Sequence, residues 1–583
     1  MEPDLDLKMK EDPQLAETNV QDGQIDSAEG LQRRLENRHV QLIAIGGSIG
    51  TALFVTIGNG LAAGGPASLL IAYVLYCGVL ACINNCLSEM IVLHPVSGGF
   101  IRLAGKWVDD ALGFMVGWNF FLYEALMIPF EITAINLILS YWRDDIPVAA
   151  VCAACIVLFA YDPRATTPSY PAFLHSPQSD FCNVFCQIHS PLAINALAVA
   201  AYGEAEFWLS SGKVLLIFLL FFFTFVTMVG GNPAHDAYGF RYWSDPGPFA
   251  EHRTAGSLGR FEGFLAAVWS AAFCIVGPEY IAMAAAEAKR PRIFVKAAFK
   301  TIYWRFGLFF ALGALCVGIV IPWNDPTLQA ILAGESSEKG GGASPYVIAM
   351  SNLKIRILPD LVNALLITSV FSAGNTLTYC ATRSLYGMAL DGRAPKILSK
   401  TKNGVPIYAF LIVICFPFLS FLQLSDNSSQ VLTWLVNLVT AGALIDYLVV
   451  CITYIQFHRA CKAQGIDRKT FPYYGYFQPY CSYIGAVCMV VVLLFYGYTA
   501  FAPWSVEVFF QNYTMQLIAP ILYFGWKLAH RTEILKPRDI DLVWDRPIVD
   551  SYEATFTSPA PGFWTEMIQM FGFKRQQEEQ VDA

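Results

Sequence analysis

The residues best suited to chemistry are charged side chains inside apolar segments of the chain. Glu124 and Glu131 lie seven positions apart, and therefore on one face of a predicted helix. Lys213 lies in the apolar sequence SSGKVLL, and Glu279 follows the helix-breaking residues 277–278 in FCIVGPEY. Charge at membrane depth is costly, so such groups usually serve ion or substrate movement. The four residues are therefore candidates for proton coupling, and Glu279 is also a candidate for pairing with an ammonium group.

Each candidate also has a structural interpretation, which the sequence leaves open. A glutamate near a helix end reaches the membrane interface, and Lys213 is close enough to a helix end to extend to the cytoplasmic surface. Glu124 and Glu131 would then pair with polar groups of neighbouring helices. Ser372 and Asn375 are better explained as hydrogen-bonding contacts between helices than as ligands.

A cluster of small residues interrupts the first apolar segment, residues 40–63, in the sequence GGSIGTALF. Glycine weakens a helix by roughly 1 kcal/mol relative to alanine, and a helix opened in this way offers backbone N–H groups to a carboxylate. A packing face for a neighbouring helix is the alternative. The second break, at 277–278, favours a transport site, because such sites lie between paired breaks. The candidate binding residues of the first break are Gly46, Gly47, Ser48, Ile49, Gly50 and Thr51.

The composition is that of a polytopic membrane protein. Of 583 residues, 55% are hydrophobic and 14% are charged, a balance that soluble proteins rarely show. A net charge of −8 without a basic domain argues against a nucleic-acid partner. The 15 cysteines lack metal-ligand spacing, and the sequence has no HExxH, GxSxG or phosphate-binding motif. We therefore expect no metal, no cofactor and no enzymatic activity.

Twelve membrane-spanning helices are predicted to position these residues. Lysine and arginine cluster in the connections after spans six, eight and ten, whereas the connections after spans one, nine and eleven have none. Positive residues stay in the cytoplasm, which places both termini there. The predicted spans are residues 40–63, 66–93, 111–142, 146–160 joined to 194–203, 206–230, 261–287, 306–323, 358–389, 405–424, 431–457, 480–502 and 508–528.

The fourth span is interrupted by a proline-rich segment. Residues 146–160 are too few to cross a bilayer comfortably, and residues 161–193 separate them from the next apolar sequence. We hypothesise that residues 161–193 are a retained intron or an insertion within span four, with a functional luminal loop as the competing hypothesis. The predicted plan is a disordered cytoplasmic tail (1–39), a transmembrane domain (40–530) and a cytoplasmic tail (531–583).

Six longer motifs carry a resemblance that covers about residues 31–535: LQRRLENRHVQLIAIGGSIGTALFV, SGGFIR, PFEITAINLILSYW, YGEAEFWLSSGKVLL, GGNPAHDAYGFRYW and VGPEYIAMAAAEAKRPR. Together they resemble the fungal amino acid permeases of the amino acid–polyamine–organocation superfamily. The resemblance implies an all-α fold with a leucine-transporter-like core of two inverted five-helix repeats and two peripheral helices. It also implies proton-coupled amino acid import across the plasma membrane by alternating access.

The resemblance also assigns roles to individual positions. Residues 46–51 match the opened helix that holds the substrate α-carboxylate, and Phe273, Ile275 and Gly277 match the signature of the second broken helix. Ile275 stands where the family usually has an aromatic residue, and Pro278 replaces a small polar one, so we expect a pocket that differs from the family average. Lys213 matches a position where a lysine takes the place of a sodium ion.

Overall similarity to dicarboxylic amino acid permeases suggests acidic amino acids as substrates, with polyamines or proline as alternatives. An amino acid sensor, or transceptor, is the competing function, although sensors in such families usually carry long cytoplasmic extensions. The expected partners are an amino acid substrate, protons and the lipid bilayer. Trafficking and ubiquitin-ligase adaptors are expected at the cytoplasmic tails.

Overall fold

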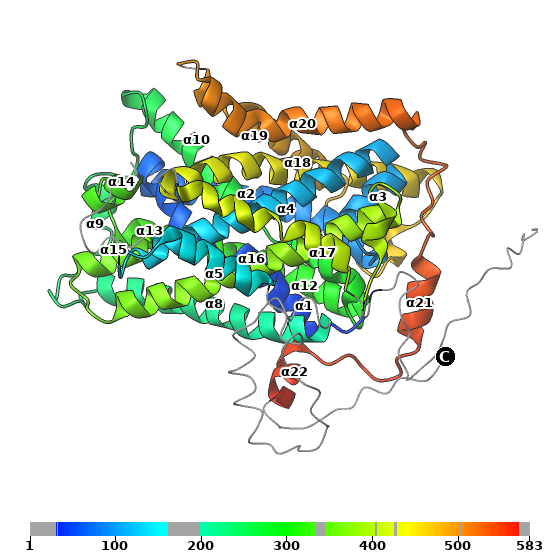
Figure 1. Cartoon of the computed structure of the whole chain (residues 1–583), viewed down its shortest axis with the longest axis horizontal. Coiled ribbons are helices and arrows are strands. Elements are labelled where there is room, and N and C mark those ends of the chain that lie inside the picture. The colour runs from blue at the N-terminus through cyan, green and yellow to red at the C-terminus, as the bar shows by residue number, and fades with distance from the viewer. Residues whose placement is uncertain are drawn as a thin grey trace, which may run out of the picture.

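A computed structural model describes residues 31, 33–143, 145–160, 199–332, 344–402, 405–424, 428–501 and 503–570. Within these ranges the secondary structure is helical apart from three isolated β-bridges. Figure 1 shows the long helices packed side by side as one bundle. The predicted insertion, residues 161–193, lies outside the described residues, as does most of the predicted N-terminal tail.

The first two spans follow each other almost without a loop. Helix α1 (Asn37–Ser48) leads into a π-helical turn, η1 (Ala52–Thr56), and then into α2 (Ile57–Leu93). The helical stretch from Ala52 to Leu93 has 42 residues, or about 63 Å at 1.5 Å per residue, twice the apolar thickness of a bilayer. Gly65 breaks it with φ 77° and ψ 170°, immediately before Pro66. The break therefore divides span one from span two, as the sequence predicts.

With two differences, the other long helices fall on the remaining predicted spans. They are α4 (Asp110–Leu139), α5 (Val148–Ala160), α8 (Val199–Met228), α10 (Gly256–Cys274) with α11 (Pro278–Ala284), α12 (Pro291–Arg305) with the π-helical η4 (Phe306–Ala311) and α13 (Leu312–Val320), α16 (Leu358–Leu390), α17 (Ile407–Val413) with the 3₁₀ helix η6 (Phe416–Leu424), α18 (Ser428–Ala463), α19 (Tyr480–Phe495) and α20 (Val506–His530). Helix α8 runs without a break from Val199 to Met228, so residues 199–203 belong to the fifth span and not, as predicted, to the fourth. The seventh span begins earlier than predicted, at Pro291. Among the described residues, nine helical stretches are long and apolar enough to cross a membrane. The chain is thus an all-α polytopic membrane protein.

Short helices connect or follow the long ones. They are α3 (Gly99–Trp107), α9 (Arg241–Ser244), η3 (Ala285–Glu287), α14 (Pro326–Leu332), α15 (Pro345–Asn352), η5 (Lys396–Ser399), η7 (Arg468–Thr470), η8 (Tyr498–Ala500), α21 (Arg546–Ala554) and α22 (Phe563–Met570). The last of them, α22, lies beside the start of α1 (Figure 1). There the Glu566 carboxylate accepts hydrogen bonds from the backbone N–H groups of Asn37, at 3.2 Å, and Arg38, at 2.7 Å.

The outer surface of the bundle is apolar where lipid would contact it. Large hydrophobic side chains are exposed along α8, α19 and α20, including Leu215, Phe222, Val487, Leu494, Ile521 and Leu528. An apolar surface of this extent on a protein is typical of a membrane-facing region. Many apolar side chains are therefore exposed on the outside of the bundle, and many polar side chains are buried inside it.

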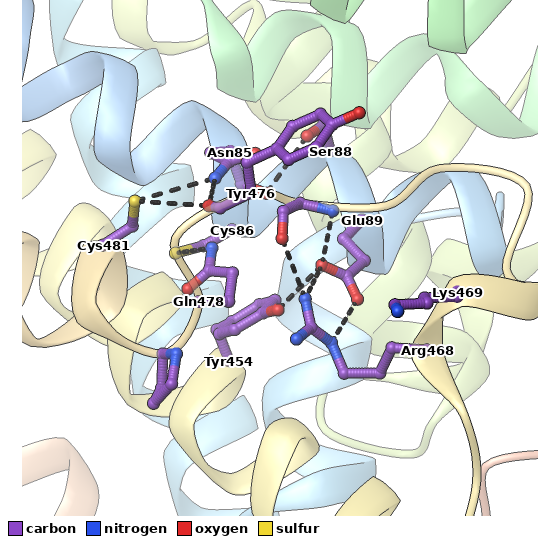
Figure 2. A network of polar contacts seen from close by, with 12 residues as sticks. Asn85, Cys86, Ser88, Glu89, Tyr454, Arg468, Lys469, Tyr476, Gln478 and Cys481 are labelled. Atoms are coloured by element: carbon purple, nitrogen blue, oxygen red, sulfur yellow. Dashed lines mark hydrogen bonds and ion pairs between the residues drawn. The ribbon is translucent and has the colours of Figure 1, made fainter.

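One buried ion pair ties the end of α2 to the connection between α18 and α19. Figure 2 shows Glu89 surrounded by donors. Arg468 donates to both carboxylate oxygens at 2.7 Å, Tyr454 donates its hydroxyl at 2.7 Å, and the backbone N–H of Gly475 donates at 3.0 Å. Glu89 has no exposed surface. A buried charge with this many partners is well compensated.

Candidate transport site

The first helix is interrupted where the small residues are. Helix α1 ends at Ser48, and Ile49 has extended backbone angles of φ −113° and ψ 96°. Helical geometry resumes at Thr51, before the π-helical turn η1. The break predicted from residues 46–51 is therefore present, and the ends of two half-helices meet inside the bundle.

The glycines of this break allow other helices to approach the backbone. A Cβ atom on Gly47 would lie 2.7 Å from the Tyr280 ring, and one on Gly50 would lie 3.0 Å from the Glu131 carboxylate. Real Cβ atoms are essentially never found as close as 2.7 Å to other atoms and rarely as close as 3.0 Å, so a larger residue at Gly47 would displace Tyr280, and one at Gly50 would press on Glu131. Both interpretations of the small residues are therefore correct. They open the helix, and they also allow neighbouring helices to pack closely against it.

The sixth span is interrupted in the same way. Helix α10 ends at Cys274, Ile275 is extended with φ −95° and ψ 100°, and Gly277 has φ +146°. Only glycine adopts this last conformation readily. Pro278 then occupies the first turn of α11, where its missing N–H costs nothing. Phe273, just before the break, packs edge to face on Phe130 with ring centroids 5.3 Å apart.

Glu279 lies inside the bundle rather than at its surface. Both of its carboxylate oxygens face the backbone N–H of Gly277, at 3.1 and 3.2 Å, and the Tyr447 hydroxyl donates to it at 2.7 Å. Its position in the first turn of α11 also favours negative charge, because the helix dipole is positive there. Glu279 therefore connects the break in span six with α18.

Lys213 is directed at the first break. Its ammonium group is buried and donates to the backbone carbonyl of Gly46 at 2.5 Å, so it does not extend to the surface. Glu131 approaches the same break from α4 and accepts a hydrogen bond from the Thr51 hydroxyl at 2.5 Å. The structure thus brings Lys213 and Glu131 to the opened backbone of helix one.

Glu206 is a member of this group that the sequence analysis did not identify. It is fully buried on α8 and accepts hydrogen bonds from Ser210 at 2.8 Å, Ser372 at 2.6 Å and Asn375 at 3.3 Å. Ser372 and Asn375 thus join α16 to α8, as expected of contacts between helices. The spacing of Glu206 and Lys213, seven residues apart on one helix face, was the signal that could have revealed it.

Glu124 and Glu131 share a helix face but not an environment. Glu124 has no exposed surface, and neither of its carboxylate oxygens has a hydrogen-bond partner among the described residues. Its charged neighbours are Glu279 and Asp446 rather than the first break. The predicted ionisable groups therefore form two sets, one at each broken helix: Lys213 and Glu131 with Glu206, and Glu124 and Glu279 with Asp446.

Two cavities adjoin the second break. The larger has a volume of about 490 Å³, and its lining includes Phe273, Trp269 and Asn59. The smaller has a volume of about 10 Å³ and lies between Glu279, Asp446, Tyr447 and other side chains. In the described part of the chain, no group of three histidine, cysteine or acidic residues is arranged to hold a metal ion.

Two interrupted helices, charged groups at each interruption and a lipid-facing exterior define a multi-pass membrane transporter. A manganese transporter from Eremococcus coleocola has a similar fold, with a TM-score of 0.50 at 14% identity, covering 88% of this chain and 94% of that one. At this identity the likeness concerns the fold alone.

Sequence relatives identify the family. The general amino acid permease AGP2 of Saccharomyces cerevisiae is 45% identical, over 90% of this chain and 84% of that protein. The dicarboxylic amino acid permease of the same yeast is 34% identical over 92% and 83%, and a proline-specific permease of Emericella nidulans is 33% identical over 94% of each. The amino acid permease family model matches residues 39–538. The chain belongs to the amino acid permease family.

Proposed function

We propose that this protein imports amino acids across the plasma membrane, coupled to protons, by alternating access. The observation that carries the proposal is the meeting of two broken helices with ionisable groups at membrane depth. The half-helix ends at residues 46–51 supply backbone N–H groups for a substrate carboxylate, and Glu279 lies at the other break, where a substrate ammonium group would pair with it. The names of the relatives, which are amino acid permeases of several kinds, support the same class of cargo.

Four groups are candidates for carrying the coupled proton: Glu279, Lys213, Glu131 and Glu124. Glu279 is the strongest, because it joins the break in α10–α11 to Tyr447 on α18, so a change in its charge would act on both elements. Lys213 holds the Gly46 carbonyl, and loss of its proton would release one donor from the first break. A single group of this kind, exposed alternately to the two sides, is enough to couple a proton to a substrate.

The membrane arrangement follows from the charged connections. We place both termini in the cytoplasm on the asymmetry of lysine and arginine, with trafficking and ubiquitin-ligase adaptors acting on the cytoplasmic tails. We also propose that residues 161–193 are an insertion or a retained intron in span four. Sequencing of the mature transcript tests this: a spliced message that still encodes the segment would contradict the intron hypothesis.

Uptake in yeast cells that lack their own amino acid permeases tests the transport function. Cells expressing the protein at their surface should accumulate a labelled amino acid against its gradient, and more strongly at acidic external pH. Glu279→Gln keeps the size of the side chain but cannot titrate, so it should lose accumulation and pH dependence while substrate exchange persists. Gly47→Val should abolish both activities by displacing Tyr280.

The control for this experiment is a charge change at the surface of the protein. Glu507 is exposed on α20, so Glu507→Gln changes the charge equally without touching either break. A non-transporting amino acid sensor would show no accumulation with the wild-type protein, although it would still bind the amino acid. Wild-type accumulation by Glu279→Gln at both acidic and neutral pH would remove Glu279 as the proton carrier.

A further inference from the structure

Three buried carboxyl groups, one each on α4, α11 and α18, lie within electrostatic range of one another. Glu124, Glu279 and Asp446 each come from one of these helices, and Glu124 lies within electrostatic range of both others. We propose that two of these residues, Glu124 and Asp446, called the acidic subsite below, bind the terminal ammonium group of a cationic amino acid side chain, as in lysine or ornithine, beside Glu279. The inference rests on the proposed transport of amino acids and specifies which of them the site selects.

The acidic subsite has unfilled acceptor atoms. Neither oxygen of Glu124 has a partner among the described residues, and Asp446 accepts one hydrogen bond from Asn119, at 2.8 Å, while its other oxygen has none. Protonation would remove the charge of Glu124, leaving one oxygen as an acceptor and the other as a hydroxyl donor. Unfilled acceptors without exposed surface are unfavourable, so a ligand with several N–H donors is the complement that these atoms lack.

The cavity beside Asp446 and Glu279 has the size of an ammonium group. No three acidic, histidine or cysteine side chains of the described residues are placed to hold a metal ion. The cavity between Glu279, Asp446 and Tyr447 has a volume of about 10 Å³, which is close to the space that one water-sized group requires. The end of an alkylammonium chain has this size, and it carries three N–H donors.

Nearby basic residues do not neutralise the acidic subsite. Arg383 on α16 is buried, but its guanidinium group is engaged by Glu287, with Nε 2.9 Å from the carboxylate. Lys213 is directed at Gly46 in the other group. The acidic subsite therefore retains an excess of carboxyl groups over cations, and this excess would attract a positively charged side chain and repel a negatively charged one.

A substrate with two amino groups can meet both breaks at once. Its α-carboxylate would bind the opened backbone of residues 46–51, and its α-ammonium group would pair with Glu279. The side chain would then extend toward Glu124 and Asp446 and place its own ammonium group between α4 and α18. A glutamate substrate would instead bring a further negative charge there, so the subsite selects against the acidic amino acids that overall similarity to dicarboxylic permeases suggests.

Uptake of labelled lysine, leucine and glutamate by cells expressing the full chain tests the acidic subsite. We expect lysine to be transported with the lowest KM. Glu124→Gln and Asp446→Asn should each raise the ratio of the KM for lysine to the KM for leucine about tenfold or more, as expected when a hydrogen bond to a charged group is lost. Glu507→Gln is the matched control and should not change this ratio. A lower KM for glutamate than for lysine, or an unchanged ratio in both variants, would overturn the proposal.

A binding measurement separates this inference from the proposed transport. Lysine should raise the thermal unfolding midpoint of the purified wild-type protein more than leucine or glutamate does, and this difference should disappear in Glu124→Gln. If cells accumulate none of the three amino acids, the proposed transport fails, but a lysine-specific stabilisation that requires Glu124 still supports the acidic subsite. If cells accumulate amino acids but lysine stabilises no more than leucine does, the acidic subsite fails and the transport function stands.

Discussion

Glu89 and Glu124 are two glutamates without exposed surface, and their surroundings are opposite. Glu89 receives hydrogen bonds from Arg468, Tyr454 and the backbone of Gly475 (Figure 2). Glu124 receives none from the described residues. The first therefore holds α2 against the connection between α18 and α19, whereas the second has other carboxyl groups as its charged neighbours and no hydrogen bond from the described residues.

The comparison shows that burial alone does not distinguish a structural acid from a functional one. What differs is the number of acceptor oxygens that the fold itself fills. A buried ion pair is expensive to break, because removing one partner leaves a charge without compensation. A buried acid without partners has no such contact to lose, so its removal should cost the fold little and should affect function instead.

The largest expected effect is that of Arg468→Met, which leaves Glu89 buried and unpaired. We expect the protein to lose about 3–5 kcal/mol of stability, as measured for other buried pairs broken on one side. Size-exclusion chromatography in detergent should show little monodisperse protein, and the amount at the cell surface should fall accordingly. Normal surface expression and an unchanged unfolding midpoint would mean that this pair does not hold the two elements together.

The double variant Glu89→Gln with Arg468→Met should recover part of that loss. It removes the buried charge together with its partner, and Tyr454 and Gly475 can still donate to the glutamine carbonyl oxygen. Replacing both members of a buried pair is often close to neutral, so the double variant should be more stable than Arg468→Met alone by roughly 1–2 kcal/mol. The thermal unfolding midpoints of the single and double variants measure this coupling directly. A double variant that is less stable than Arg468→Met alone would contradict a coupling between Glu89 and Arg468.

Glu566 is a third buried glutamate, and the number of its hydrogen-bond partners lies between those of Glu89 and Glu124. Among the described residues, its carboxylate accepts hydrogen bonds from backbone N–H groups at the start of α1, and burial raises its pKa from the ordinary 4.5 to about 7. Since docking raises the pKa, the docked helix α22 should be most stable below about pH 4.5 and should loosen as the pH rises through 7. Hydrogen–deuterium exchange of residues 563–570 at pH 5.5 and pH 8 measures this.

Glu566→Gln should remove that pH dependence, because glutamine does not titrate. The loss of one of the two contacts at the helix start should cost about 1 kcal/mol, the usual value for a helix cap. Exchange in α22 that changes with pH in the variant as it does in the wild type would show that another group is responsible.

The smallest expected effect on stability is that of Glu124→Gln. Because Glu124 has no partner among the described residues, its replacement should shift stability by less than about 1 kcal/mol, or should increase it by removing a buried charge. Unfolding midpoint and surface expression should match those of the wild type. A loss as large as that of Arg468→Met would make Glu124 a structural residue and remove the contrast with Glu89.

The helix breaks and most span boundaries could be predicted from the sequence, because glycine and proline act on their own segment. The cluster at residues 46–51, the pair at 277–278 and the boundary at Pro66 are each local signals. Charged residues in apolar segments were equally visible, and Lys213, Glu131 and Glu279 were found in this way.

Partners between distant segments could not be predicted in the same way. Arg468 lies 379 positions after Glu89, and no pattern near either residue indicates the other. Glu206 was overlooked because its partners Ser372 and Asn375 come from α16. The seven-residue spacing of Glu124 and Glu131 correctly predicted a shared helix face. The fold nevertheless gives the two residues different neighbours: Glu131 lies at the first break, and Glu124 has Glu279 and Asp446 as its charged neighbours.

The contact of Glu566 with the start of α1 also has a consequence for synthesis. Asn37 and Glu566 are 529 positions apart, so at 5–20 residues per second the ribosome needs on the order of a minute between them. Throughout that time the first turn of α1 lacks the carboxylate that later caps it. Helix α1, whose break forms one half of the site, is therefore among the first elements to be synthesised and among the last to gain all its contacts. It gains the last of them only when the chain has been translated as far as α22.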